Sequence, residues 1–518
     1  MNGPQRKHYD IIVVGSGASG LSLTQLLALR GKKVLLLEKH FYLGGSLTRF
    51  RKHGVAFDTG FHFTGGFANE GILHNMLTVL RIRNQIEPIY LDDPKSNRYV
   101  FEHDGQIYDL PSGVENLKKT LKEYFPKDTD GIEAYFTLCK KCYVEIMSID
   151  ISKDTQIPRK LDEDYRSLAD VLDELIKSDN LRGILSTYCM CYGVKPSEVS
   201  FANHARVAYG LYEAVARVKN GGDAFVDAFK KEFENLDVDV RLQTYITECR
   251  EIKNREVGYF VLNTGEKVTC DQCVFTVHPK TVLETLPHEH LSKAFIDRVE
   301  GFEPSMGFFS LYCLLCSDNP DEPLVPTITS FFPDPDINQL LEPANEKATA
   351  IVVLTSNEYV KGKLHKVVTV LESSFFKDVS AWQHTSLKKR GEAYKDYKQD
   401  RSNQILKRIT NFFPEYKDRL KVVESASMLS YRDYLHSPDG TAYGIKQKMG
   451  QINLFGRLPL RNLYASGQSA VLPGMVGAMV SSFIISHTIL GGVPAGKIHN
   501  HIKVLKKQLY IPTYHSPG

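Results

Sequence analysis

Three glycines near the start of the chain have the spacing of a loop that binds a dinucleotide. Gly15, Gly17 and Gly20 follow the apolar run Ile11–Val14 and precede a stretch with helical periodicity. In such a loop the first glycine permits a tight turn, the second lets the backbone approach a pyrophosphate, and the third lets helix and strand pack closely. The free N–H groups at the helix start then face an anion. The expected contact residues are Gly15, Ser16, Gly17, Ala18, Ser19 and Gly20.

An acidic residue and a second glycine pair follow at the spacing that a bound dinucleotide would require. Glu38 ends the apolar run Val34–Leu37, about 20 residues after the loop, where a carboxylate can bind ribose hydroxyls. A Gly44-Gly45 turn comes next, and in a large class of flavoproteins such a turn brings backbone against the pyrophosphate and ribityl of FAD. We therefore place Lys39 and Ser46 in the same predicted site.

A strand, a glycine turn and a helix near the C-terminus predict the other end of this site. The run Asn462–Ser466 leads to Gly467, and Gly474–Ala478 opens an apolar helix. A helix N-terminus at this point would stabilise negative charge on a reduced flavin. An ordinary glycine-rich helix start is the alternative. No second GxGxxG follows a predicted strand, so FAD is favoured over a separate NAD domain.

Length and composition are those of a globular protein with two or three lobes. The chain has 518 residues, 42% of them hydrophobic and 24% charged, and its net charge of +3 gives no support for nucleic-acid binding. Residues 1–8 show no secretory signal, and the apolar run 475–490 is short for a membrane span. We expect a cytoplasmic protein and leave peripheral contact with a membrane open.

The nine cysteines include three CxxC pairs, at Cys139/Cys142, Cys270/Cys273 and Cys313/Cys316. A zinc site or a redox dithiol is one interpretation of each pair. We favour reduced, buried thiols, because the pairs lie in amphipathic or apolar segments and no secretory signal is visible. We assign no metal site.

Two insertions divide the predicted dinucleotide-binding lobe into separate segments. The expected FAD-binding domain comprises residues 1–90, 201–290 and 426–496. The expected substrate or cap domain comprises residues 91–200 and 291–425, and a basic tail covers 497–518. The fold class is α/β, with a Rossmann-like lobe into which a mixed α+β substrate lobe is inserted. Within the insertions we expect helices over 113–124, 129–147, 167–178 and 386–413, and strands over 307–316, 349–355 and 366–372.

Several further segments complete a resemblance to a known family. They are Phe57–His62, Gly221-Gly222, Tyr434–Gly444 and Leu463–Gln468. With the glycine motifs above, these segments make the chain resemble the phytoene desaturase, retinol saturase and carotenoid isomerase family of FAD enzymes. The resemblance spans nearly the whole chain.

The resemblance implies an FAD-binding lobe of the amine-oxidase (GR2) type beside a substrate lobe, with an apolar tunnel that reaches the flavin ring. It implies that Gly15–Gly20 hold the pyrophosphate, that Glu38 holds the adenosine ribose, and that the backbone of Ile246 holds adenine. The residues that match the flavin end of the site are His62, Gly467, Gln468, Val476, Gly477 and Ala478.

The implied reaction changes carbon–carbon double bonds of an apolar polyene or isoprenoid, such as a carotenoid or retinoid. Desaturation, saturation and isomerisation all fit, and the substrate, the electron acceptor and the oligomeric state are left open. The ring of FAD can take or give a hydride, while the protein orients the substrate and excludes water. His62, Tyr443 and Lys446 are candidates to move the accompanying proton, with a structural role as the alternative for each. We assign no catalytic residue.

Two other functions stay open. An amine-oxidase-type flavoenzyme would share the FAD lobe, but such enzymes usually show an aromatic pair that faces the flavin, and the single tryptophan, Trp382, lies in a charged region. A flavin-dependent lipid carrier without turnover would need a cavity, but the flavin would not have to reach it. Basic and apolar residues over 497–507 suit either a weak interfacial helix or an exposed tail.

Overall fold

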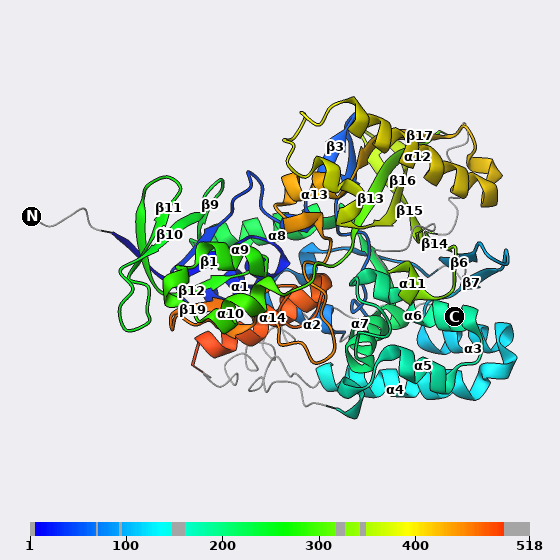
Figure 1. The fold of residues 1–518 in the computed structure, drawn as a ribbon, viewed down its shortest axis with the longest axis horizontal. Coiled ribbons are helices and arrows are strands. Elements are labelled where there is room, and N and C mark those ends of the chain that lie inside the picture. Colours follow the sequence, from blue (N-terminus) through cyan, green and yellow to red (C-terminus); the bar gives the residue numbers. More distant parts are fainter. Residues whose placement is uncertain are drawn as a thin grey trace, which may run out of the picture.

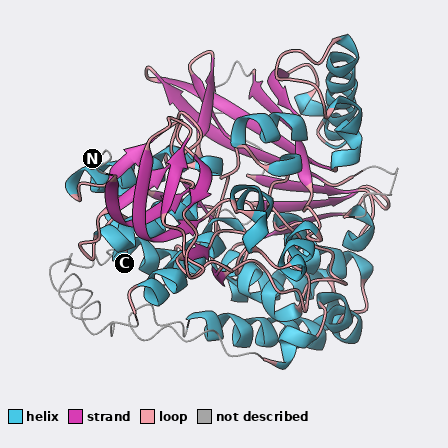
Figure 2. Ribbon diagram, turned by 60° about the vertical axis from the view of Figure 1, so that its left-hand side comes forward, coloured by secondary structure: helices cyan, strands magenta, loops and turns pink. Residues whose placement is uncertain are grey.

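The computed structural model describes residues 6–68, 71–92, 96–147, 161–316, 327–341 and 349–491. Two large sheets, each covered by its own helices, form most of these parts of the chain (Figure 1). A cluster of helices lies below the second sheet in this view, and the turned view of Figure 2 shows the two sheets apart from it.

The first sheet brings together strands from three distant parts of the chain. Its path runs β10-β11-β12-β1-β2-β9, and β19 also pairs with β12. The pairs β1–β2, β1–β12, β2–β9 and β12–β19 are parallel, as in a dinucleotide-binding sheet. The strands are β1 (Lys7–Val14), β2 (Val34–Leu37), β9 (Asp239–Arg241), β10 (Ile246–Arg250), β11 (Tyr259–Leu262), β12 (Lys267–Phe275), β18 (Gly456–Arg457) and β19 (Leu463–Ala465).

Helices cover both faces of the first sheet, so successive residues of β1 pack into different cores. Ile11 and Val13 pack with α1, α8 and α14, whereas Tyr9 and Ile12 pack with α9 and α10. This arrangement explains why the run is apolar without alternation. The covering helices are α1 (Ala18–Ala28), α8 (Gly221–Asn235), α9 (Pro279–Thr285), α10 (Lys293–Glu300) and α14 (Gly474–Ile489).

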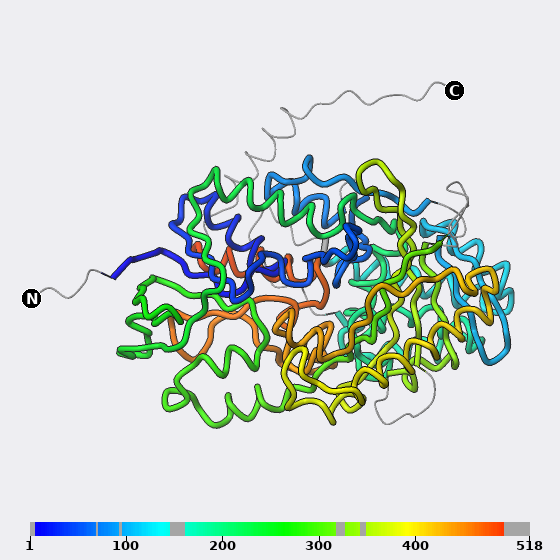
Figure 3. The backbone as a smooth tube through the Cα atoms, turned by 90° about the horizontal axis from the view of Figure 1, so that it is seen from above, coloured from blue at the N-terminus to red at the C-terminus, as the bar shows by residue number. Residues whose placement is uncertain are grey.

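Helix α14 lies directly beside α1, although the two are more than 400 residues apart in the sequence. Figure 3 shows the C-terminal segment in red next to the blue N-terminal segment. The hydroxyls of Ser19 and Ser482 are 2.7 Å apart across this contact. Residues Gly477 to Ser486 are all buried, in agreement with the expected buried helix.

The second sheet is antiparallel except for the pair β6–β14. Its path is β17-β13-β16-β15-β14-β6-β7. Helix α12 (Glu392–Phe412) covers one face, where Ile405 and Ile409 pack against Phe309 and Leu311. The strands are β6 (Asn97–Phe101), β7 (Ile107–Leu110), β13 (Gly307–Leu315), β14 (Ile328–Phe332), β15 (Ile351–Val360), β16 (Lys363–Ser374) and β17 (Leu420–Ala426).

The helical cluster packs against the other face of the second sheet. Its centre holds the buried ring of His204, and each ring nitrogen has a hydrogen-bond partner. Nε2 lies 2.9 Å from the Tyr135 hydroxyl, and Nδ1 lies 2.7 Å from the Tyr192 hydroxyl. The helices of the cluster are α3 (Val114–Tyr124), α4 (Thr129–Met147), α5 (Leu168–Leu175), α6 (Asp179–Ser186) and α7 (Phe201–Glu213). The remaining elements are α2 (Ile72–Val79), α11 (Ile337–Leu340), α13 (Met428–Leu435), β3 (Arg49–Lys52), β4 (Val55–Asp58), β5 (Pro88–Tyr90) and β8 (Ala216–Val218).

Some elements differ from the sequence expectations. Helix α7 packs with α4 in the helical cluster, although we expected the FAD-binding segment to resume at residue 201. The helix expected over 386–413 begins only at Glu392, because Gly391, with φ +79°, interrupts the helical backbone. The strand expected over 349–355 extends to Val360, because β16 pairs with it along its whole length. The tail 497–518 lies outside the described residues.

Candidate functional site

The glycine loop joins the carboxyl end of β1 to the start of α1. Gly15 has φ +96°, a backbone conformation that favours glycine. A Cβ on Gly20 would lie 1.8 Å from the Gly15 carbonyl oxygen, so the turn and helix can approach this closely only without a side chain. A Cβ on Gly17 would meet no atom within 4 Å, whereas one on Gly45 would lie 3.2 Å from the Gly17 Cα. The second diglycine turn therefore lies against the loop, and open space remains beside Gly17.

The start of α1 has the properties of an anion site. Gly17 is the N-cap, no side chain caps the helix, and its first turn holds no acidic residue. The first N–H groups of a helix lack partners within the helix, and its dipole adds partial positive charge there. With the open space beside Gly17, these groups fit the diphosphate of a dinucleotide.

Ser16 and Gly44 connect the loop to the carboxylate at the end of β2. The N–H of Ser16 donates to Glu38 Oε2 at 2.9 Å, and the Ser16 hydroxyl donates to the same oxygen. The N–H of Gly44 donates to Ser16 Oγ at 3.1 Å, and the N–H of His40 donates to Glu38 Oε1 at 2.7 Å. A carboxylate offers about four acceptor positions, and three of them are taken here, so Glu38 retains one position for a ribose hydroxyl.

The loop that follows β9 runs beside Glu38, where the resemblance implies the adenosine. The N–H of Thr244 donates to the Glu38 carbonyl oxygen at 2.9 Å. Ile246, 6% exposed, opens β10 immediately after this loop. Lys39 is exposed, and its ammonium lies 5.2 Å from the centre of the Tyr245 ring. The structure thus brings these predicted residues to one end of the site.

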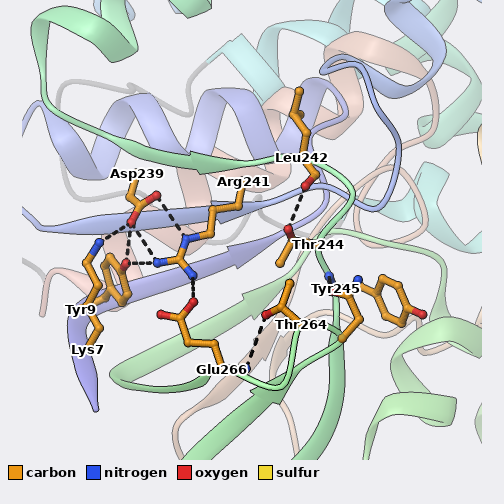
Figure 4. A network of polar contacts seen from close by, with 10 residues as sticks. Lys7, Tyr9, Asp239, Arg241, Leu242, Thr244, Tyr245, Thr264 and Glu266 are labelled. Carbon is orange, nitrogen blue, oxygen red and sulfur yellow. Dashed lines mark hydrogen bonds and ion pairs between the residues drawn. The ribbon is translucent and has the colours of Figure 1, made fainter. Parts of the chain in front are cut away.

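A network of polar contacts holds β9 in position for this loop (Figure 4). Asp239 accepts hydrogen bonds from Lys7, at 2.7 Å, and from the Tyr9 hydroxyl, both on β1. Arg241 pairs with Asp239 at 3.2 Å and with Glu266 at 2.5 Å. Partial burial alone would raise the pKa of Asp239, but hydrogen bonds from Arg241, Lys7 and Tyr9 outweigh it and lower that pKa to about 2. The ionised carboxylate therefore links β9 to β1.

The C-terminal glycine turn meets the loop through Thr276, at the carboxyl end of β12. The Thr276 hydroxyl donates to the carbonyl oxygens of Val14, at 2.9 Å, and of Gly15, at 3.1 Å. Gly467 has φ +115°, and a Cβ on it would lie 3.0 Å from the Thr276 carbonyl oxygen. Its N–H donates to Ser481 Oγ of α14 at 3.0 Å. Three distant segments therefore converge at the end of β1.

A large cavity extends from this site between the second sheet and the helical cluster. The space between its lining atoms, its opening included, is about 1540 Å³. Residues Gly60–Gly66 and Leu472–Gly477 line it from the first lobe, and strands β6, β14, β15 and β16 line it from the second. Most of this lining is aliphatic or aromatic, so the cavity fits an extended apolar ligand.

The start of α14 forms part of the cavity wall. Pro473 is its N-cap, and no side chain caps the helix. Gly474, Val476 and Gly477 line the cavity, and a Cβ on Gly477 would lie 2.2 Å from the Leu472 carbonyl oxygen. The partial positive charge of this helix end is therefore available to a ligand group with negative charge.

The cavity contains two of the three side chains that we considered for proton movement. His62 and Tyr443 line it, and Lys446 does not. Burial lowers the pKa of His62 to about 4, so its imidazole is neutral near pH 7. Burial raises the pKa of Tyr443 well above its usual value, so its hydroxyl stays protonated. For Lys446 the geometry favours the structural alternative, because its ammonium pairs with Glu303 at 3.3 Å and neither residue lines the cavity.

The remaining predicted residues lie around these two places. The exposed Ser46 adjoins the cavity loop, since a Cβ on Gly60 would lie 3.0 Å from the Ser46 Cβ. Ala478 is buried inside α14, and the Gln468 carbonyl oxygen accepts from the Gln447 side chain at 2.5 Å. Ala18 and Ser19 form the first turn of α1. Their roles toward a ligand remain proposals.

Sequence analysis missed Thr276, whose hydroxyl bonds to the glycine loop and whose carbonyl oxygen lies beside the C-terminal turn. The sequence did offer a signal, because a residue with a hydroxyl group directly follows a buried strand. The carboxyl ends of parallel strands meet at one edge of a sheet, so such a residue can be placed near the glycine loop. It also missed the cavity residues of β6, the strand that begins at Asn97, because no motif marks them. Pairing with β14 brings this strand to the cavity.

Charged groups are rare in the cavity. Among the described residues that line it, none is an aspartate or glutamate, and Arg206 is the only lysine or arginine. Arg206 pairs with Asp164 at 2.6 Å. In the described parts of the chain no cluster of metal-binding side chains occurs, and all nine cysteines are free thiols. Burial raises the pKa of Cys142 and of Cys313 to about 12.

Comparisons with known proteins agree with this geometry. The model of the NAD(P)-binding Rossmann-like domain matches residues 13–78. All-trans-retinol 13,14-reductase of Danio rerio is 26% identical over 93% of this chain and 86% of its own. Prolycopene isomerase 1 of an Oncidium hybrid cultivar is 31% identical over 28% of this chain and 25% of its own. The resemblance to the phytoene desaturase, retinol saturase and carotenoid isomerase family is confirmed.

The fold also resembles that of a solved structure. Putrescine oxidase, solved with putrescine bound, superposes with a TM-score of 0.63 over 95% of this chain and 99% of its own, at 14% identity. This likeness supports the Rossmann-like fold of the amine-oxidase type. No described helix is both long enough and apolar enough to cross a membrane.

Proposed function

We propose that the protein is an FAD-dependent oxidoreductase that acts on carbon–carbon double bonds of an apolar polyene or isoprenoid. The observation that carries this proposal is the position of the α14 N-terminus, which borders the apolar cavity and follows the turn at Gly467. The relatives are named for retinol and prolycopene, both of which are polyenes, and this supports the substrate class.

Bound FAD would supply hydride transfer to or from a polyene carbon. The chain's own groups would bind its two ends. Glu38 and the uncapped start of α1 suit the adenosine ribose and the diphosphate, and Val476 and Gly477 suit the ring. The start of α14 would stabilise negative charge on the ring, and the apolar cavity walls would orient the polyene and exclude water.

A net saturation or desaturation also moves a proton, and the cavity offers two groups for it. The neutral imidazole of His62 can accept a proton, and the protonated hydroxyl of Tyr443 can donate one. An isomerisation would need no net proton. An amine substrate fits less well, because a cation would find Arg206 and no described carboxylate in this cavity.

The proposal is tested by following the cofactor and the substrate separately. We expect denaturation of the purified protein to release FAD. We also expect anaerobic incubation with all-trans-retinol or a cis-carotene to change the polyene, with the flavin supplied reduced for saturation and oxidised for desaturation. Mass analysis then distinguishes a gain of two hydrogens, a loss of two, or altered geometry at constant mass. A protein that cannot be reconstituted with FAD would refute the cofactor; a reducible FAD protein that changes no polyene would indicate a carrier.

A further inference from the structure

Three polar atoms of the described cavity residues are buried without a hydrogen-bond partner: Oδ1 of Asn97, the Tyr143 hydroxyl and Nε of Arg206. Of these three, only Oδ1 of Asn97 is solely an acceptor. Asn97 lies at the start of β6 and lines the cavity. Its Nδ2 donates to the Tyr99 hydroxyl at 3.2 Å, but its carbonyl oxygen, Oδ1, is buried and has no hydrogen-bond partner. A buried acceptor without a donor is unfavourable, so a ligand that brings a donor to this oxygen would gain a hydrogen bond that the empty cavity does not provide.

Asn97 and its neighbours form one polar part of a cavity whose lining is mostly aliphatic or aromatic. The hydroxyls of Tyr99 and Tyr188 border the same space. Burial raises the pKa of both phenols, so both remain neutral hydrogen-bonding groups. A second, smaller cavity shares Asn97, Tyr99 and Tyr188 with the first and is otherwise lined largely by apolar side chains such as Leu117 and Leu121.

Asn97 and the start of α14 contribute to the cavity from different lobes. Asn97 belongs to the second sheet, whereas the start of α14 packs with the first sheet. In the view of Figure 1, α14 and β6 lie to the left and to the right of α7. A ligand that fills the cavity can therefore contact both Asn97 and the start of α14.

The chemistry of the oxygen selects the donor. A hydrocarbon end would leave Oδ1 of Asn97 unpartnered, and an ionised carboxylate would oppose its partial negative charge. An ammonium group would find no described carboxylate in the cavity and would meet the charge of Arg206. A neutral hydroxyl can donate to Oδ1 and accept from a neighbouring phenol.

We propose that Asn97 binds the terminal hydroxyl of an amphiphilic polyene alcohol and so determines which double bond reaches the cofactor end of the cavity. This inference rests on the proposed function and names the substrate class within it. Asn97 acts as a positioning residue: it touches the end of the substrate and not the reacting carbons. The bound hydroxyl group then fixes the position of the substrate along the cavity, and with it the double bond that reacts.

The test compares three ligands that differ only at this end: all-trans-retinol, its methyl ether and the hydrocarbon in which hydrogen replaces the hydroxyl. Their affinities for the oxidised holoenzyme are measured by ligand fluorescence. We expect the alcohol to bind about tenfold more tightly than the ether or the hydrocarbon, the size of one neutral hydrogen bond. Equal affinities for the three ligands in the wild-type protein would overturn the inference and leave the proposed function intact.

The variant Asn97→Leu keeps the number and branching of the side-chain heavy atoms and removes the acceptor. We expect it to lose the preference for the alcohol while its affinity for the hydrocarbon stays within about twofold, which also shows that the cavity is intact. During turnover, the wild-type protein should react at a single double bond of the alcohol, whereas Asn97→Leu should give a mixture of products that have reacted at different double bonds. A preference that persists in Asn97→Leu would overturn the inference.

A matched control is Asn180→Leu. Asn180 is half-buried, donates to Asp104 at 2.9 Å and to Tyr108 at 3.1 Å, and does not line the cavity. We expect this variant to keep the preference for the alcohol. Failure of every polyene to bind the wild-type holoenzyme would refute the proposed substrate class, and this inference with it.

Discussion

Gly17 and Gly20 belong to one loop, yet a side chain would meet different surroundings at the two positions. Gly17 has φ −65°, which any residue can adopt, and a Cβ there would have no neighbour within 4 Å. At Gly20 the Cβ would lie 1.8 Å from the carbonyl oxygen of Gly15. The open space at Gly17 therefore suits a ligand, whereas the lack of a side chain at Gly20 serves packing within the chain.

This difference predicts opposite effects of two equal substitutions. We expect Gly17→Ala to keep the melting temperature of the apoprotein within about 2 °C of wild type, but to retain less than about a tenth of the flavin. Gly20→Ala should lower the melting temperature of the apoprotein by several degrees, because backbone must move. Thermal unfolding and the absorbance of released chromophore measure the two effects. A Gly17→Ala protein with full flavin content would contradict the placement of the diphosphate.

At the scale of elements, a buried ion cluster joins the two lobes next to the cavity. Arg49 of β3 lies 2.8 Å from Asp58 of β4 and 2.6 Å from Glu358 of β15. Arg217 of β8 pairs with Asp58 at 3.1 Å and donates to the Thr355 carbonyl oxygen at 3.0 Å. Arg49 and Asp58 lie shortly before the cavity-lining segment 60–66 in the chain. Their ion pairs with each other and with Glu358 therefore hold this segment against the second sheet.

We expect Arg49→Met to destabilise the protein strongly. Its side chain is 3% exposed, and its removal would leave Asp58 and Glu358 without their shared cation, which costs about 3–5 kcal/mol for a buried pair. The control is Lys219→Met, which breaks an exposed pair with Glu87 whose side chains are 59% and 66% exposed and should cost less than about 1 kcal/mol. Urea unfolding measures both. Equal effects of the two variants would show that the cluster adds nothing beyond a surface pair.

At the scale of the whole molecule, buried histidines link stability to pH. Burial lowers the pKa of His62 and of His278 to about 4, and that of His204 to about 3. Each folded-state pKa lies below the unfolded value of 6.5, so the unfolded chain binds more protons than the folded one between these values. Their contribution to stability is therefore complete above pH 6.5 and decreases as the pH falls toward 4.

We expect the melting temperature to fall steadily between pH 6.5 and pH 4.5, with each histidine contributing at most about 1.4 kcal/mol per pH unit. The variant His278→Asn should weaken this dependence. His278 Nδ1 accepts from the N–H of Lys280 as the N-cap of α9, and an asparagine oxygen can take over that bond. A dependence on pH that is unchanged in His278→Asn would contradict the buried neutral state of this ring.

Local patterns were sufficient to predict the elements that carry the glycine motifs. Strand β1, the loop that follows it, helix α1 and Glu38 at the end of β2 lie where we expected them. Each depends on residues close together in the sequence, because a turn, a helix start and a buried strand leave local marks. The two alternatives for Lys446 stayed open at the level of the sequence, because nothing nearby shows its pairing with Glu303, 143 residues away.

By itself the sequence determined the glycine loop, the carboxylate at the end of β2 and the family that the chain resembles, since these rest on residue types at short spacings. Only the tertiary structure decided which groups share the cavity: Asn97 on β6, His62 after β4 and Gly477 on α14 meet there from three regions of the chain. The physical reason is that cavities form where packed layers meet, and the sheet pairings and helix contacts that assemble those layers join residues hundreds of positions apart.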